Sequence, residues 1–127
     1  MISFEDFMFV DGCPIYLQII QYIKRGIASE TIHNGEEAPS RRALSALLGV
    51  NPNTIQKAYH NLEEEGILTS RSGAKSYLCI DQKTVGRIRR ELLIGDTKEW
   101  VNAMKQLNIS KEEAFSLAEN IWTAKEL

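Results

Sequence analysis

The sequence predicts a mainly α-helical fold with one small β-hairpin, in which an N-terminal domain is followed by a short helical tail. Three observations predict it. Apolar residues recur at helical spacing through most of the chain, a strand-turn-strand pattern surrounds Ser72 and Gly73, and no strand signal follows Asp81. We therefore place the first domain at residues 1–80, with its core at 14–80, and the tail at residues 81–127.

The composition is typical of a globular protein that builds its own core. Of the 127 residues, 43% are hydrophobic and 25% are charged, which is near the average for folded domains. No apolar run approaches the roughly 20 residues of a membrane-spanning helix, and the first residues are acidic, unlike a secretory signal. We therefore expect a cytoplasmic protein with no membrane partner.

The cysteines and histidines form no pattern typical of a catalytic or metal site. Cys13 and Cys79 lack a second Cys or His at metal-ligand spacing, so we expect two small buried side chains and no metal or cofactor. His33 and His60 have no Ser, Cys or carboxylate arrangement that marks a triad or a general base. The sequence therefore favours a protein that is not an enzyme.

The first elements are an N-terminal segment and an amphipathic helix. Residues 2–10 mix aromatic and β-branched residues and end at an Asp-Gly turn, which predicts a short edge strand or an arm. From Pro14, which is well placed at a first helical position, we expect a helix that ends before Asn34 and Gly35. Its apolar residues recur at helical spacing: Tyr16, Ile19, Ile20, Ile23 and Ile27.

A short helix follows between Ser40, a typical N-cap, and Gly49, a typical helix stop. Its predicted apolar face consists of Leu44, Leu47 and Leu48. The next helix begins almost at once, with Asn51 as N-cap and Pro52 as first helical residue, and ends at Gly66. The stripe that this helix buries is Ile55, Ala58, Tyr59 and Leu62. Two short helices joined by a tight glycine turn form a helix-turn-helix.

A hairpin and a helical tail complete the chain. The run ILTSRSGAKSYLCI predicts a β-hairpin, which makes the domain a winged helix-turn-helix. In the tail, Gly95 and Asp96 predict a kink or break in the first helical stretch, and Ser110 and Glu113 form a capping box for the last helix. The tail has more apolar surface than its helices bury among themselves, so we expect a homodimer. The predicted interface is Ile88, Leu92, Trp100, Met104, Phe115, Ile121 and Trp122.

The helix after Pro52 has a second stripe, composed of Asn53, Gln56, Lys57 and His60. Every member offers a hydrogen bond and none carries a negative charge. Because Asn and Gln pair bidentately with adenine and Lys donates to guanine, this stripe suits the major groove of double-stranded DNA. It is the strongest functional signal in the sequence.

Basic residues surround this stripe although the net charge is −2. Arg41 and Arg42 lie in the first turn of a helix, where cations oppose the helix dipole, and a phosphate partner explains them. Arg71 and Lys75 flank the tip of the wing and suit phosphate contacts. The predicted DNA-binding set is Ser40, Arg41, Arg42, Asn51, Asn53, Thr54, Gln56, Lys57, His60, Arg71, Ser72, Gly73 and Lys75.

These residues resemble the GntR family, whose winged-helix pattern runs approximately P-S-x-R-x-L, L-G-V, T-(V/I)-x-x-A-Y-x-x-L, E-G and R-x-G. The matching residues are Pro39, Ser40, Arg42 and Leu44; Leu48, Gly49 and Val50; Thr54, Ile55, Ala58, Tyr59 and Leu62; Glu65 and Gly66; Arg71 and Gly73. The short tail and the run from Asn51 to Thr54 are similar to the small YtrA-like subfamily.

The resemblance implies a dimeric repressor, and similar members often control neighbouring transporter genes. For a twofold dimer we expect a palindromic operator. It implies that Arg42 contacts phosphate, that residues 53–57 enter the major groove and that Gly73 lies at the wing tip. The chain departs from the family at Ala38, which stands in place of Leu, at Lys75, in place of a second Gly, and at Pro52, in place of an Arg on the recognition helix.

Three questions stay open at this point. A tail of this size can hardly supply the walls of a ligand pocket of roughly 300–1,000 Å³, so we expect no large ligand site, and a small-molecule effector at the dimer interface remains an alternative. The winged helix could instead be a protein-interaction module, although its recognition stripe is polar. A thiol- or metal-responsive regulator is a further alternative, and it requires a cysteine near a histidine in space.

Overall fold

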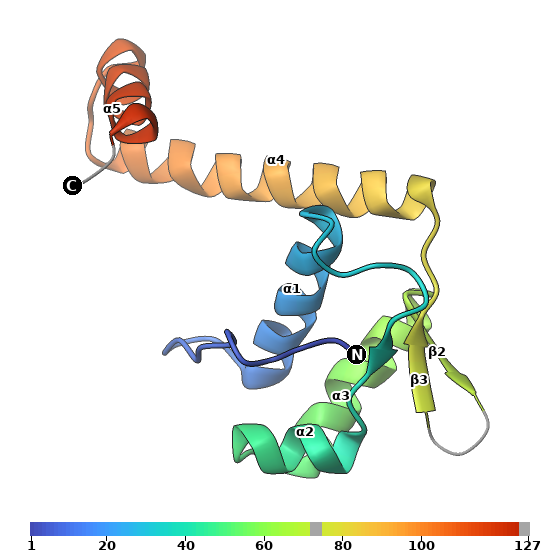
Figure 1. Ribbon diagram of the computed structural model, residues 1–127. Coiled ribbons are helices and arrows are strands. Elements are labelled where there is room, and N and C mark those ends of the chain that lie inside the picture. The colour runs from blue at the N-terminus through green and yellow to red at the C-terminus, as the bar shows by residue number, and fades with distance from the viewer. Residues whose placement is uncertain (72–74, 125–127) are drawn as a thin grey trace. The chain divides into compact units, whose positions relative to one another are not determined.

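The computed structural model describes residues 1–71 and 75–124, and the chain divides into two compact units, Met1–Arg90 and Glu91–Leu127. The elements are α1 (Ile15–Ala28), β1 (Glu37–Ala38), α2 (Arg41–Leu48), α3 (Pro52–Glu64), β2 (Leu68–Arg71), β3 (Lys75–Leu78), α4 (Gln82–Gln106) and α5 (Lys111–Thr123) (Figure 1). The chain is mainly helical with a small antiparallel sheet, so the predicted winged helix-turn-helix is confirmed.

Helix α1 forms the centre of the first unit and packs against α3. Four isoleucines at helical spacing are buried along it, as predicted: Ile19, Ile20, Ile23 and Ile27. Pro14 is the N-cap of α1 rather than its first residue, and the helix ends at Ala28. The N-terminal segment is an arm without strand structure, in which Ile2 and Phe4 are buried and the Ile2 N–H donates to the Glu37 carbonyl at 2.8 Å.

Both helices of the helix-turn-helix have the predicted caps. The Ser40 hydroxyl accepts a hydrogen bond from the Ala43 N–H at 3.0 Å, and the Asn51 side chain accepts one from the Asn53 N–H at 2.8 Å. These acceptors satisfy backbone donors that have no partner inside the helix. Gly49 ends α2 in the left-handed region with φ 68°, which only glycine adopts without strain.

The prediction that Leu47 faces the core is wrong. Leu44 is fully buried, but Leu47 is 64% exposed, and Ser45 takes the second inward position. The Ser45 hydroxyl donates to the Val50 carbonyl at 2.6 Å, so this polar side chain is satisfied inside the turn. Helix α2 is only eight residues long and packs against α3 on one side. The apolar spacing of its sequence therefore predicts more buried residues than α2 has.

The wing is a three-stranded sheet in the order β1-β3-β2, all antiparallel. The predicted hairpin of β2 and β3 is present, with Leu68 opposite Leu78 and Arg71 opposite Lys75. The short strand β1, which the sequence analysis did not predict, pairs with the other edge of β3. The predicted tip residues Ser72 and Gly73 lie outside the described residues.

Helix α4 is one helix from Gln82 to Gln106, so the chain has no break at Gly95. A glycine inside a helix costs only about 1 kcal/mol, which the surrounding helix formers offset. Asp81 caps the start of this helix by accepting the Thr84 N–H at 2.8 Å, and that bond lowers the pKa of the Asp81 carboxyl. Among the described residues, no helix is long and apolar enough to cross a membrane.

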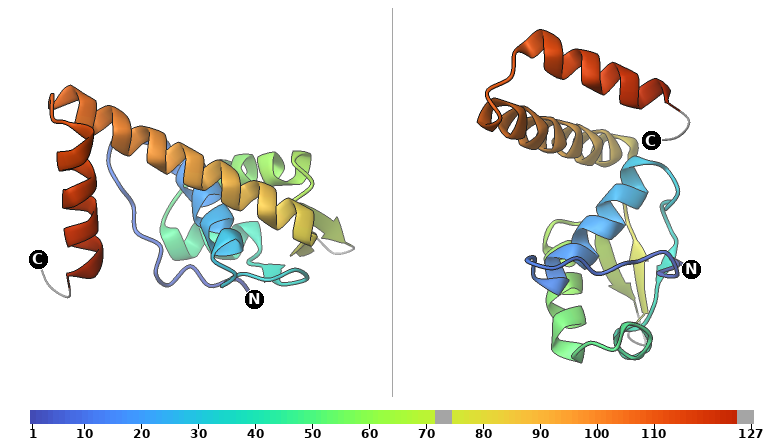
Figure 2. Two further views of the ribbon diagram at one scale, coloured as in Figure 1. Left: turned by 90° about the horizontal axis from the view of Figure 1, so that it is seen from above. Right: turned by 90° about the vertical axis from the view of Figure 1, so that its left-hand side faces the viewer.

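Helix α5 begins beside the C-terminal end of α4 after a short reversal of the chain (Figure 2). Its predicted N-cap is confirmed, since the Ser110 hydroxyl accepts the Glu113 N–H at 3.1 Å. The starts of α4 and α5 are therefore both set by a side chain that accepts from the first turn of the helix.

The prediction of two buried cysteines is wrong, because Cys13 and Cys79 are both exposed free thiols. Cys79 follows β3, and its neighbours Leu78 and Ile80 are buried, so the alternation of an extended chain points Cys79 outward. Across the part of the chain that the structure describes, no three His, Cys, Asp or Glu side chains are grouped as a metal site.

Candidate nucleic-acid interface

The two stripes of α3 lie on opposite sides of the helix. The apolar stripe is completely buried against the rest of the first unit: Ile55, Ala58, Tyr59 and Leu62. The polar stripe is exposed: Asn53, Gln56, Lys57 and His60. Burial of one stripe holds the helix rigidly and leaves the other available for contact, which is the arrangement of a recognition helix.

Arg41 does not point freely to solvent but connects α2 to α3. Its Nε donates to the Gln56 side-chain oxygen, and its Nη2 lies 2.7 Å from a Glu63 carboxylate oxygen. Its guanidinium carbon also lies 5.1 Å from the centre of the Tyr59 ring. At least two of the five N–H donors of Arg41 are therefore engaged within the chain, and a phosphate contact by its remaining donors stays a prediction.

Arg42, the next residue, is exposed and makes no ion pair or hydrogen bond with any side chain that the structure describes. It lies in the first turn of α2, where no acidic residue offsets its charge. A cation at this end of a helix is not explained by helix stability. Of the two neighbouring arginines, Arg42 is therefore the one available to a phosphate.

The other basic groups near α3 rest on aromatic rings. The Lys57 Nζ lies 4.0 Å from the centre of the Tyr16 ring on α1, and the Arg71 guanidinium carbon lies 4.7 Å from the centre of the Tyr77 ring on β3. Such cation–π contacts restrict long side chains without neutralising their charge. The sequence analysis missed both aromatic partners, because the residues of each pair lie on different elements.

Each acidic residue at the end of α3 is paired with a basic group. Glu63 binds Arg41, Glu64 lies 2.9 Å from His60, and Glu65 lies 3.0 Å from the Lys24 ammonium. Two of the three carboxylates between residues 38 and 80, Glu63 and Glu65, are therefore in ion pairs with a permanently charged side chain. These ion pairs reduce the repulsion that the acidic run would exert on an anionic partner.

The remaining residues of the predicted DNA-binding set either cap a helix or lie outside the exposed stripe of α3. Ser40 and Asn51 are N-caps, and Thr54 is half-buried in the first turn of α3. Lys75 is exposed at the start of β3, opposite Arg71, so the described part of the wing presents two cations. The structure thus brings Arg42 and the α3 stripe together in one helix-turn-helix.

A buried tyrosine sets the position of α3. The Tyr59 hydroxyl donates to the Pro39 carbonyl at 2.7 Å, which ties α3 to the residue before the cap of α2. Burial raises the pKa of Tyr59 far above its ordinary value, although the nearby Arg41 acts in the opposite direction. The ring therefore stays neutral and keeps its donor at physiological pH.

In the tail, the predicted interface residues differ in exposure. Ile88 is 1% exposed, so it belongs to the core of its own chain and offers a partner nothing. Leu92, Trp100 and Met104 are half-buried. The exposed ones lie on α5: Phe115, Ile121 and Trp122.

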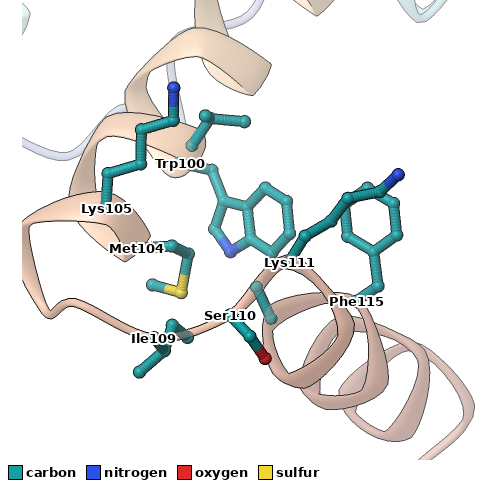
Figure 3. Close-up of a pocket in the computed structure, with 9 residues that line it drawn as sticks. Trp100, Met104, Lys105, Ile109, Ser110, Lys111 and Phe115 are labelled. Atoms are coloured by element: carbon teal, nitrogen blue, oxygen red, sulfur yellow. The ribbon is translucent and has the colours of Figure 1, made fainter.

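An apolar groove of about 310 Å³ lies between the end of α4 and the start of α5 (Figure 3). The rings of Trp100 and Phe115 stack there with centroids 6.0 Å apart, and Met104 and Ile109 contribute to the apolar lining. The groove is open to solvent and lies at the lower end of the size range of ligand pockets, so the expectation of no large ligand site stays a prediction.

Comparison with known proteins gives the context of this site. Residues 15–77 match the family described as bacterial regulatory proteins, gntR family. The chain is 32% identical over 108 residues to the HTH-type transcriptional regulator YhcF of Bacillus subtilis, covering 85% of this chain and 89% of YhcF. It is 41% identical over 71 residues to the HTH-type transcriptional repressor YtrA of the same organism, covering 56% of this chain and 55% of YtrA.

Solved structures agree with the sequence relatives. A GntR family transcriptional regulator from Listeria monocytogenes superimposes with a TM-score of 0.78 at 34% identity, covering 88% of this chain and 98% of that one. YtrA from Sulfolobus acidocaldarius, a GntR-family transcription factor, gives a TM-score of 0.54 at 26% identity, covering 91% and 97%. The chain belongs to the GntR family and is a DNA-binding transcriptional regulator with a winged helix-turn-helix.

Proposed function

We propose that the protein is a cytoplasmic repressor that binds a palindromic operator as a homodimer. The observation that carries the proposal is α3, which buries one complete stripe and exposes the hydrogen-bonding stripe of Asn53, Gln56, Lys57 and His60. The relative YtrA is named a transcriptional repressor, which supports this direction of control.

The dimer is inferred from the tail. Large apolar side chains of α5 are exposed, including Trp122 at 90% and Phe115 at 54%, and a symmetric copy would bury them. Two recognition helices of such a dimer would contact successive major-groove segments if they lay about 34 Å apart, one helical turn of DNA, and their twofold symmetry would match a palindromic operator. The resemblance to YtrA-like regulators suggests a transporter operon as the target.

The test is fluorescence-anisotropy binding to the DNA upstream of the protein's own gene, with a random duplex as competitor and over a series of salt concentrations. We expect preferential binding that weakens with salt. Arg42→Ala should lower affinity for all duplexes and reduce the salt slope by about 1, whereas Gln56→Ala should reduce the preference for the operator. Lys98→Ala, which removes an exposed cation of the tail, is the matched control and should change neither.

Two outcomes would contradict the proposal. If the upstream DNA and a genome-wide selection of bound fragments both show no preferred sequence, the protein is not an operator-binding repressor. If sedimentation at micromolar concentration shows only monomer, both without DNA and with the selected operator, the homodimer is wrong.

A further inference from the structure

The side chain of Gln56 is held by Arg41 in one orientation. The Arg41 Nε donates to the Gln56 Oε1, and the same guanidinium is held from two other directions by Glu63 and the Tyr59 ring. Gln56, Tyr59 and Glu63 lie at positions i, i+3 and i+7 of α3, so one side of the helix receives Arg41. Two further contacts therefore position the guanidinium that restrains Gln56.

The chemistry of arginine decides which end of the amide faces it. A guanidinium has only donors and no acceptor, so the amide oxygen must point toward Arg41 and the NH₂ group away from it. The Gln56 side chain is otherwise exposed, and its nitrogen has no partner among the residues that the structure describes. On the recognition surface, Gln56 thus presents its two N–H donors, while its oxygen is turned toward Arg41.

We propose that Arg41 makes Gln56 a donor-only contact that selects guanine over adenine at one operator position. A glutamine pairs bidentately with adenine only when its oxygen accepts from N6 while its nitrogen donates to N7. The guanine edge offers two acceptors, N7 and O6, which match a group with two donors. This inference rests on the proposed function, and it specifies which base Gln56 contacts in the operator.

Asn53 provides the comparison inside the same helix. Its backbone N–H is held by the Asn51 cap, but no hydrogen bond to its side chain is formed by the described residues. Its amide is free to present both oxygen and nitrogen, the pattern that adenine matches. The two amides of the stripe therefore differ in specificity because of a residue on α2, not because of their own chemistry.

The experiment measures affinities by anisotropy for four duplexes that differ only in the base pair read by residue 56. That position is identified as the one where Gln56→Ala equalises the four affinities. We expect the wild type to favour guanine over adenine there by about tenfold. Arg41→Met, which keeps the length of the side chain but removes its donors, should lower that ratio to about one or below, because the freed oxygen again accepts from adenine.

Three controls separate this effect from general damage. Glu63→Gln removes the ion pair of Arg41 but leaves its bond to Gln56, so the guanine-to-adenine ratio should stay as in the wild type. Arg42→Met should weaken all four duplexes by one factor. The base preference at the position read by Asn53, found with Asn53→Ala, should be the same in Arg41→Met and in the wild type.

The inference is overturned if the wild type favours adenine, or if Gln56→Ala changes the base preference at no position of the operator. It is also overturned if Arg41→Met leaves the guanine-to-adenine ratio unchanged while thermal unfolding shows that the variant is folded. It is equally overturned if Glu63→Gln lowers the ratio as much as Arg41→Met does, because loosening of the helix pair then explains both. These results differ from a failure of the proposed function, in which no duplex is preferred over random DNA.

Discussion

The two compact units differ in where their apolar side chains lie. In residues 1–90 most large apolar residues of the helices contribute to the core, and many are completely buried. In the second unit, Ala114 is the one buried hydrophobic residue that the structure describes. The large apolar residues that stay exposed there are Leu93, Ile94, Leu107, Phe115, Leu117, Ile121 and Trp122.

This difference shows that different interactions stabilise the two units. The first unit is stabilised by the burial of its own side chains, which is the dominant favourable contribution to folding. The second unit is stabilised by a helix cap and one aromatic stack, while its large apolar side chains stay mostly exposed. A change in the first unit should therefore affect folding, and a change in the second should affect association.

The largest expected effect is the loss of a core side chain. Leu62 is fully buried on α3, so Leu62→Ala should lower the free energy of unfolding by about 3 kcal/mol. Leu107 is 70% exposed, so the same truncation there should change it by no more than about 0.5 kcal/mol. Urea unfolding at equal protein concentrations measures both, and equal losses would contradict the comparison.

The next effect concerns the association of the tail. Trp122→Ala should weaken the dimer by about 2 kcal/mol, roughly thirtyfold in dissociation constant, because large aromatic side chains dominate interfaces. Sedimentation equilibrium measures this change. Met8→Ala is the matched control, since Met8 is 82% exposed in the other unit and its loss should leave the dimer intact. A stronger effect of Met8→Ala would place the interface elsewhere.

A third prediction tests the hydrogen bond that ties α3 to α2. Tyr59→Phe leaves the Pro39 carbonyl without its donor and should cost about 1.5 kcal/mol of unfolding free energy. Burial raises the pKa of Tyr59 above its ordinary value near 10, so above about pH 10 the unfolded chain releases a proton that the folded chain keeps. The wild type should therefore lose stability as pH rises above 10.

The Tyr59→Phe variant is also the control for the pH dependence. In denaturant titrations at about pH 9 and about pH 11, the wild type should lose more unfolding free energy than Tyr59→Phe, which has no phenol to ionise at this position. Identical pH dependence in the two proteins would show that the Tyr59 hydroxyl does not carry this loss.

The smallest effect is a local one in the tail. Ser110→Ala removes the acceptor for the Glu113 N–H and should destabilise α5 by about 1 kcal/mol. Amide hydrogen exchange should speed up in α5 and stay unchanged in α1 and α3, because the two units do not share a core. Faster exchange in α1 would show that they unfold together.

Local chemistry made much of the fold predictable. The caps at Ser40, Asn51 and Ser110 and the stop at Gly49 depend on backbone donors and φ values close in sequence, and all four are present. The helix continues through Gly95 because the cost of one glycine is small beside the preference of a whole helix. The prediction for Leu47 was wrong because helical spacing shows which residues share a face of α2, but it does not show how much of that face α3 covers.

The candidate site was predictable only in part. The exposed stripe of α3 follows from helical spacing alone, since one buried stripe leaves the opposite face to solvent. Three features of the structure each join residues from different elements. They are the contacts of Arg41, the Tyr16 ring beneath Lys57 and the groove at Trp100. No local pattern contains such pairs, so the composition and spacing of the sequence do not distinguish Arg41 from Arg42, although the family resemblance singles out Arg42.

The sequence by itself determined where the helices start and stop, which stripe of α3 is buried and which family the chain resembles, because caps, periodicity and motifs are local. Only the tertiary structure decided that Arg41 is engaged while Arg42 is free, that Ile88 belongs to the chain's own core, and that the tail keeps its apolar side chains exposed. The physical reason is that burial and side-chain pairing depend on what the fold brings alongside a residue, and distance along the chain does not encode it.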